Sequence, residues 1–160
     1  MADRDWEAKP TYESERVRID ATCSPAVLYD MKLPRKLEDR EVGLMLDLAE
    51  YHLEQDRPFL ALVRQRRGTG VITARHRKVF SDWLDDRRAT LARDDVAVIV
   101  VVPEGIFRAL LRVVYRFRSP PLRTSTTPDV SGAVEAMRSE LVRIGQPVLP
   151  RTEAFFARIT

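Results

Sequence analysis

The strongest constraint on the fold is the run VAVIVVV, seven consecutive apolar residues at positions 96 to 102. All of them except Ala97 are β-branched, and β-branched side chains favour strands. A strand that is apolar on both faces belongs in the middle of a sheet that is covered by helices. The run is also far shorter than the roughly 20 residues that a membrane-spanning helix needs. We therefore predict an α/β fold in which this strand is central.

Four more strands are expected around the central one. They cover residues 16–22, 26–34, 59–65 and 122–127, and the first two form a hairpin across the turn Ser24-Pro25. Helical spacing of apolar residues and N-cap signals predict helices over residues 37–55, 73–93, 104–117 and 129–144. The order is then β-β-α-β-α-β-α-β-α, which predicts a mixed, mostly parallel sheet of about five strands with helices packed on it.

The length of 160 residues fits one domain with short extensions. Residues 15–145 form the predicted α/β domain. Residues 1–14 are polar and show no period, so we predict a flexible N-terminal leader, from which Trp6 and Tyr12 could still dock on the domain. Residues 146–160 form a C-terminal tail whose apolar side chains could pack on the domain.

Two features favour a cytoplasmic protein. The single cysteine, Cys23, excludes an internal disulfide bond and a metal site built from cysteines. Residues 1–20 are charged and contain no apolar core of the kind found in a signal peptide. We expect the cytoplasm, with a peripheral place at the membrane if the apolar helix described below binds lipid.

Positive charge is concentrated in the middle of the chain. Residues 64–123 contain 14 Lys and Arg against 6 Asp and Glu, a net charge of +8, whereas the rest of the chain has 13 against 18, a net charge of −5. A basic face of this kind attracts an acidic protein, an anionic lipid or nucleic acid. Specific nucleic-acid binding is not expected, because the sequence has no helix-turn-helix spacing, zinc finger or RNP-type aromatic strand.

The densest part of this charge is RRGTGVITARHRK, residues 66–78. Its two glycines permit backbone N–H groups to point at an anion, and Thr73 is a good N-cap for a helix whose positive end lies beside them. An ordinary polar turn between a strand and a helix is the alternative. The predicted residues for binding a partner or an anion are Arg64, Arg66, Arg67, Gly68, Gly70, Thr73, Arg75, Arg77 and Lys78.

Three stretches carry a resemblance to a known family: FLALVRQRRGTGVITARHRKVF at 59–80, VAVIVVV at 96–102, and PPLRTSTTPDVSGAVEAMR at 120–138. With the element order, they resemble the STAS domain family, especially its SpoIIAA-like branch, over residues 15–145. This family includes anti-sigma-factor antagonists and the cytoplasmic domains of sulfate transporters. The resemblance implies a bacterial signalling protein without a cofactor, which acts by docking at the junction between strand and helix.

In the antagonists of that family, a phosphorylated serine opens the helix at this junction, and acidic residues precede it. By resemblance, Thr73 stands at the position of the serine, while Arg64 and Ile72 stand where the acidic residues would be. Thr73 is therefore a candidate phosphorylation site, because a helix N-terminus stabilises the added negative charge. The loss of the acidic residues argues against the partner-switching cycle of the family.

Helix 104–117 is predicted to be apolar over an unusually wide arc, about 240° at 100° per residue, broken by a stripe of arginines. Three explanations stay open: packing against the C-terminal tail, a homodimer interface, or a membrane surface whose headgroups the arginines reach. Lipid binding has a separate basis, since relatives of the SpoIIAA-like branch share a fold with lipid-carrying domains. The predicted interface or membrane residues are Phe107, Arg108, Leu111, Arg112, Tyr115 and Arg116.

Enzymatic chemistry has little support in the sequence. His52 and His76 are the only histidines, and no acidic residues accompany them at metal-ligand spacing, so no metal ion is expected. No nucleophile elbow surrounds Ser24 or Ser81.

We therefore expect a non-enzymatic regulatory or scaffold module that binds an acidic protein partner through the basic junction. The alternative is a peripheral membrane or lipid-binding module that uses the helix over 104–117.

Overall fold

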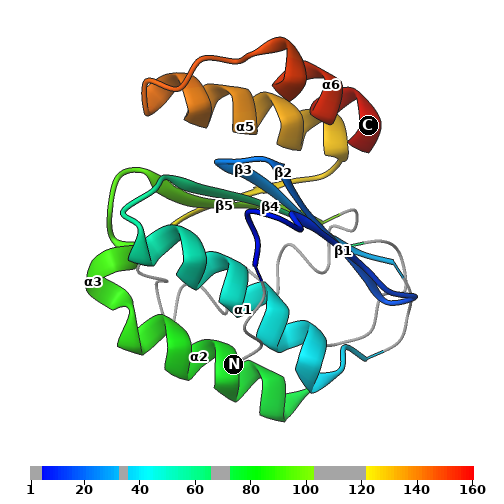
Figure 1. Cartoon of the computed structure of the whole chain (residues 1–160), viewed down its shortest axis with the longest axis vertical. Helices are drawn as coiled ribbons and strands as arrows, with labels where there is room; N and C mark the ends of the chain where they lie inside the picture. The colour runs from blue at the N-terminus through cyan, green and yellow to red at the C-terminus, as the bar shows by residue number, and fades with distance from the viewer. Residues whose placement is uncertain (1–4, 33–35, 66–72, 103–121) are drawn as a thin grey trace.

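The structure, a computed structural model, describes residues 5–32, 36–65, 73–102 and 122–160. In these ranges a six-stranded sheet lies between two layers of helices (Figure 1). Two antiparallel pairs are followed by three parallel ones, so the prediction of an α/β fold with a mixed, mostly parallel sheet is confirmed. The strands stand side by side in sequence order: β1 (Thr11–Glu13), β2 (Val17–Cys23), β3 (Ala26–Met31), β4 (Phe59–Gln65), β5 (Val96–Val101) and β6 (Arg123–Thr127).

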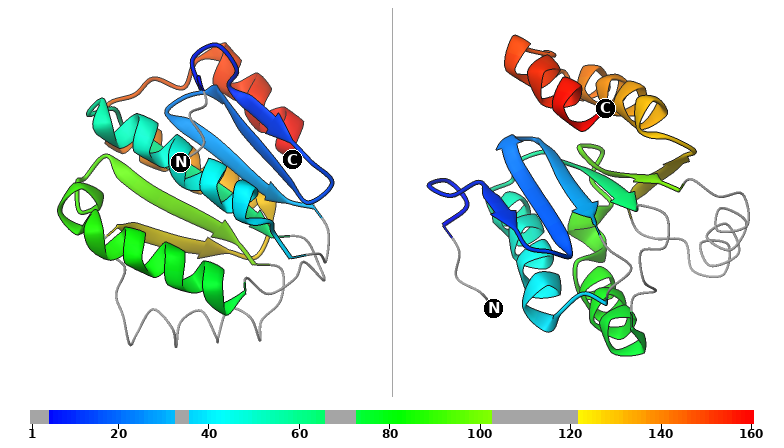
Figure 2. Two further views of the ribbon diagram at one scale, coloured as in Figure 1. Left: turned by 60° about the horizontal axis from the view of Figure 1, so that its bottom comes forward. Right: turned by 90° about the vertical axis from the view of Figure 1, so that its right-hand side faces the viewer.

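The helices divide between the two faces of the sheet (Figures 1 and 2). One face carries α1 (Asp39–Glu54), α2 (Ala74–Asp86) and α3 (Arg88–Leu91). The opposite face carries α5 (Val130–Arg143), which ends before Gly145 with a φ of 72° as its glycine predicts, and α6 (Pro150–Ile159). The predicted helix 104–117 lies outside the described residues.

The central strand β5 is buried on both sides, as its sequence predicts. Val96 belongs to the core cluster that contains the buried face of α1, and the partly buried Val98 packs against this cluster. Ala97, Ile99 and Val101 belong to the cluster that contains α5 and α6. Each face of the strand therefore lies in a different core, which is why the run has no polar positions.

The number and order of the elements differ from the prediction in three places. The sheet has six strands rather than about five, because β1 pairs with β2; its sequence TYE shows no apolar alternation, so backbone pairing alone defines it. The predicted helix 73–93 is two helices that meet at Arg87. The predicted C-terminal tail forms α6, which begins with Pro150 in the first turn.

Residues of the predicted leader and tail contact the rest of the molecule. Trp6 is buried, and its indole N–H donates to Asp47 Oδ2 on α1 at 3.3 Å. From the tail, Phe155, Phe156 and Ile159 are buried in the core cluster with β3, β4, β5 and α5.

The contact between α1 and α2 includes a buried acidic residue. Glu50 on α1 is 5% exposed, and its Oε1 accepts from the Trp83 indole at 2.5 Å and from the Arg87 guanidinium at 2.8 Å. These bonds link the last turn of α1 to the last turn of α2. The two helices therefore start side by side at the other end, where the candidate site lies.

Candidate functional site

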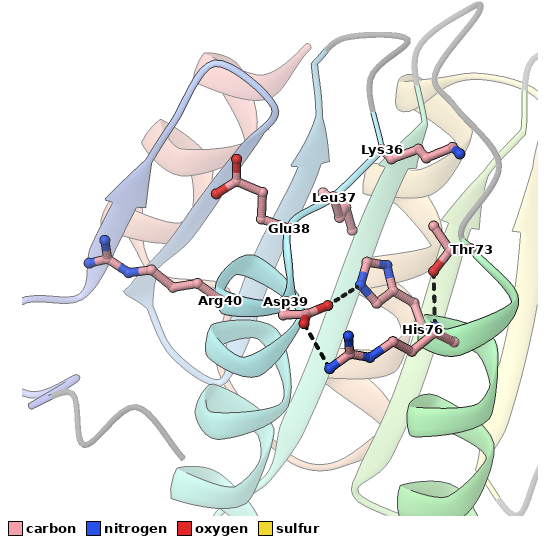
Figure 3. A pocket seen from close by; sticks show the side chains of 8 residues that line it. Lys36, Leu37, Glu38, Asp39, Arg40, Thr73 and His76 are labelled. Atoms are coloured by element: carbon pink, nitrogen blue, oxygen red, sulfur yellow. Dashed lines mark hydrogen bonds and ion pairs between the residues drawn. The ribbon is translucent and has the colours of Figure 1, made fainter.

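An open pocket of about 610 Å³ lies between the N-terminal ends of α1 and α2 (Figure 3). Both helices follow parallel strands, α1 after β3 and α2 after β4, so the pocket lies at the carboxyl edge of the sheet. In open α/β sheets this edge is the usual place for a binding site. The lining residues are Lys36, Leu37, Glu38, Asp39, Arg40, Thr73, Arg75 and His76.

His76 is the most deeply buried of the charged and polar side chains in the pocket. It is 5% exposed, and its Nε2 lies 2.8 Å from Asp39 Oδ1. A carboxylate only accepts hydrogen bonds, so Nε2 carries the proton and donates it. The other nitrogen, Nδ1, is buried and has no hydrogen-bond partner among the described residues. In the neutral ring Nδ1 therefore carries an unused lone pair.

Asp39 joins the two helix ends. Besides the bond from His76, its Oδ2 lies 2.9 Å from the Arg75 guanidinium. The hydrogen bond from His76 lowers the pKa of Asp39 below its usual value, and the charge of Arg75 acts in the same direction. Asp39 is consequently a carboxylate at neutral pH, which keeps the proton of the neutral His76 ring on Nε2.

The two helices that border the pocket begin with opposite charge. The first turn of α1 contains Asp39 and Glu41, which suits the positive end of a helix dipole. The first turn of α2 contains no acidic residue, and its opening sequence is ARHRK. Arg75 and Lys78 are about three-quarters exposed, at 77% and 76%.

The structure brings part of the predicted binding residues to this pocket. Thr73 and Arg75 line it, and the Thr73 hydroxyl accepts from the His76 backbone N–H at 3.1 Å, so its predicted capping role is confirmed. Arg77 and Lys78 are exposed on the first two turns of α2. The remaining predicted loop residues, Arg66, Arg67, Gly68 and Gly70, lie outside the described residues.

Arg64, the first residue of the predicted basic junction, has a different role in the structure. Its Nε and NH2 atoms donate to the two carboxylate oxygens of Asp30 at 2.9 and 2.5 Å, and its NH1 donates to the Ile159 carbonyl at 2.7 Å. Asp30 is 1% exposed. This pairing ties β4 to β3 and to α6 on the face opposite to α1 and α2, so the guanidinium is turned away from the pocket.

The residues predicted for a dimer or membrane interface lie outside the described residues. These are Phe107, Arg108, Leu111, Arg112, Tyr115 and Arg116. In the described part of the chain, no helix combines the length and the apolar character needed to cross a bilayer. The same part holds no group of three or more His, Cys, Asp or Glu side chains arranged to bind a metal ion.

A second histidine cluster lies at the opposite edge of the sheet. The Ser24 hydroxyl lies 2.9 Å from His52 Nε2, and His52 Nδ1 lies 3.0 Å from the Leu48 carbonyl. Because the carbonyl must accept, Nδ1 donates and Nε2 accepts from Ser24. Burial also lowers the pKa of His52. The group behind the ring is the Leu48 backbone carbonyl and not a carboxylate of the kind that stabilises a charged imidazole. The pair therefore serves to anchor the β2–β3 turn to α1.

Sequence reasoning did not find the contact between His76 and Asp39, which are 37 positions apart. The sequence does carry a signal for this contact. The helix α1, which follows β3, starts with acidic residues, and the helix α2, which follows β4, starts with basic residues. Since neighbouring parallel strands place such helix ends together, the two charges could have been expected to meet.

No protein-family model, curated protein or solved structure matches this chain. The resemblance to the STAS family therefore stays a prediction from the sequence.

Proposed function

We propose that this chain is a non-enzymatic regulatory or scaffold module that binds an acidic segment of another protein. The docking surface consists of the pocket and the first two turns of α2, with Arg75, Arg77 and Lys78 as its cations. The pocket supplies a concave centre, and the exposed cations supply a rim that attracts acidic side chains before contact.

The charge pattern of α2 is the observation that carries this proposal. Cations in the first turn of a helix oppose the helix dipole, so Arg75 and Arg77 each destabilise the helix by roughly 0.3–1 kcal/mol at low salt, and Lys78 in the second turn does so by less. Arg75 pairs with Asp39 on the neighbouring helix, and Lys78 pairs with Asp82 one turn further along α2. A local arrangement that does not serve the fold is typical of a functional surface. An acidic partner at this end would interact favourably with both the cations and the dipole.

The sequence resemblance to the STAS family supports the same kind of function, because members of that family act by docking at this junction. Phosphorylation of Thr73 stays a prediction, and its hydroxyl lies in the pocket as the helix cap. The lipid-binding alternative also stays a prediction, since it depends on the segment 104–117.

Charge reversal on α2 tests the proposal. The double variant Arg77→Glu/Lys78→Glu should fold about as well as the wild type, because acids near a helix N-terminus are favourable and the Lys78–Asp82 pair that it loses is exposed. Immobilised wild-type protein and variant are compared for the proteins that they retain from a cell extract, quantified by mass spectrometry. We expect the wild type to retain one or a few acidic proteins that the variant loses and that high salt releases.

The matched control is Arg57→Glu/Arg88→Glu, which makes the same change in net charge at exposed positions away from the pocket. This control should retain the same acidic proteins as the wild type. Equal loss from both double variants would show a general charge effect, and retention by both would exclude α2 as the docking surface.

A further inference from the structure

One ring nitrogen of His76, a residue that lines the pocket, is buried and has no hydrogen-bond partner in the part of the chain that the structure describes. Its ring is 5% exposed and lines the pocket, and Nδ1 has no hydrogen-bond partner among the described residues. In Figure 3, Nε2 points at Asp39, and Nδ1 lies on the other side of the ring. Buried polar atoms are nearly always hydrogen-bonded, so an exception in a pocket points to a missing ligand atom.

We propose that this pocket binds a phosphate-class dianion, a tetrahedral oxyanion with two negative charges, and that His76 takes up a proton from solvent on Nδ1 to donate a hydrogen bond to it. The carrier of the dianion follows from the proposed function: it is the partner protein, whose phosphorylated side chain would supply the group. The pocket, at about 610 Å³, is large enough for the oxyanion together with part of the segment that carries it.

The charges around His76 favour a dianion over a single carboxylate. When His76 is protonated, it and Arg75 share the single negative charge of Asp39, which leaves one positive charge beside Nδ1. Lys36 adds a second positive charge from the segment before α1. The N-terminus of α2 adds about half a charge more.

The other charged groups that line the pocket already have partners. Glu38 lies 2.9 Å from the Arg16 guanidinium, so its negative charge is balanced. The Arg40 guanidinium keeps its positive charge, but it lies over the Tyr12 ring, 5.9 Å from the centroid, and points away from His76 in Figure 3. The net charge at the centre of the pocket is therefore determined by four residues: Asp39, Arg75, His76 and Lys36.

Asp39 is the positioning residue of this site. By accepting from Nε2, it turns Nδ1 toward the ligand, and its negative charge stabilises the ring after protonation. Anion binding and proton uptake are consequently coupled, so the dianion should raise the pH at which His76 titrates.

The two histidines of the chain make a direct test by NMR. Ring C–H resonances are followed against pH in the full-length protein, with about 20 mM sodium sulfate or with sodium chloride at equal ionic strength. The variant His76→Gln assigns the signals. Sulfate is the probe because it stays a dianion across the range. We expect the midpoint of the His76 titration to rise by about 0.5–1 pH unit, which corresponds to roughly three- to tenfold tighter sulfate binding by the protonated ring.

His52 is the internal control, because both of its ring nitrogens are already paired. Its signals should not respond to sulfate. Acetate at the same ionic strength should move the His76 midpoint much less than sulfate does. An unchanged His76 midpoint overturns the proposal, and so does a response to acetate as large as that to sulfate.

A pair of lysine variants separates direct contact from general charge. Lys36→Gln removes a cation from the pocket lining, whereas Lys9→Gln removes an exposed one that lies outside it. Lys36→Gln should reduce the sulfate response by at least half, and Lys9→Gln should leave it nearly unchanged. Equal reductions would contradict a site centred on the pocket.

Failure of this inference can be told apart from failure of the proposed function. Charge-dependent capture of a protein partner without a sulfate effect on His76 would remove the oxyanion site and keep the docking surface. A sulfate effect without any partner that depends on the α2 cations would keep the oxyanion site and remove the protein as its carrier.

Discussion

Replacing Arg64 with methionine should show that this arginine stabilises the fold and is not part of a docking surface. The change keeps much of the apolar side chain but removes the guanidinium that makes two hydrogen bonds to Asp30 and one to the Ile159 carbonyl. Asp30 is 1% exposed, so its carboxylate loses its cation while it remains out of water.

The expected loss of stability is large. Breaking a buried ion pair from one side typically costs about 3–5 kcal/mol. The whole free energy of unfolding of a domain is only about 5–15 kcal/mol. For a chain of this length the loss corresponds to a fall in Tm of about 6–20 °C.

Urea unfolding followed by far-ultraviolet circular dichroism measures this effect, with Arg75→Met as the matched control. Arg75 also pairs with an aspartate, but the side chains of Arg75 and Asp39 are 77% and 59% exposed, so its loss should cost at most about 1 kcal/mol. The double variant Asp30→Leu/Arg64→Met should recover most of the stability, because an apolar pair replaces the ion pair. Equal losses in Arg64→Met and Arg75→Met would refute the reasoning.

Three further predictions concern the buried polar groups of α1. Burial lowers the pKa of His52 below its usual 6.5, so below about pH 6.5 the unfolded chain binds a proton that the folded chain does not bind. The free energy of unfolding should therefore fall as the pH drops below about 6.5. In His52→Gln, the urea midpoint should depend less on pH between about pH 7 and 5. An unchanged pH profile in this variant would contradict that assignment. Ser24→Ala removes the hydroxyl that donates to His52 and should cost about 1 kcal/mol in thermal unfolding; a neutral substitution would show that the turn is not anchored there. Glu50→Ala removes the acceptor of the Trp83 indole, so it should lower the free energy of unfolding by about 1.5–3 kcal/mol and shift the tryptophan emission. Most of this loss of stability should persist in an Arg87→Ala background, because the Arg87 side chain is 42% exposed.

The sequence predicts the sheet well where burial alone determines a strand. The run at 96–102 became β5, with its alternate residues in two different cores. The helix from about 37 to 55 and the cap at Thr73 were also predictable, because their signals are local. β1 was not, since its three residues are defined by pairing with β2 rather than by their own pattern.

Charged side chains were predicted less well than apolar ones. Arg64 looked like the start of a basic loop, but in the strand register it faces Asp30, which no local pattern reveals. His76 was treated as one of several basic residues, although its contact with Asp39 leaves the other ring nitrogen buried and without a hydrogen-bond partner among the described residues. In both cases the function of a side chain depends on a partner more than 30 positions away, which only the packing of strands and helices brings close.

The order of the strands has a consequence for how the chain folds. In the described part of the chain, each strand pairs only with strands next to it in the sequence, so the sheet can be assembled one neighbour at a time. The exception is α6, whose Arg158 donates to Thr22 on β2 across 136 positions. Docking of this helix carries the largest loop-closure entropy among these contacts. We therefore expect α6 to be the last part to join the fold and the first to leave it.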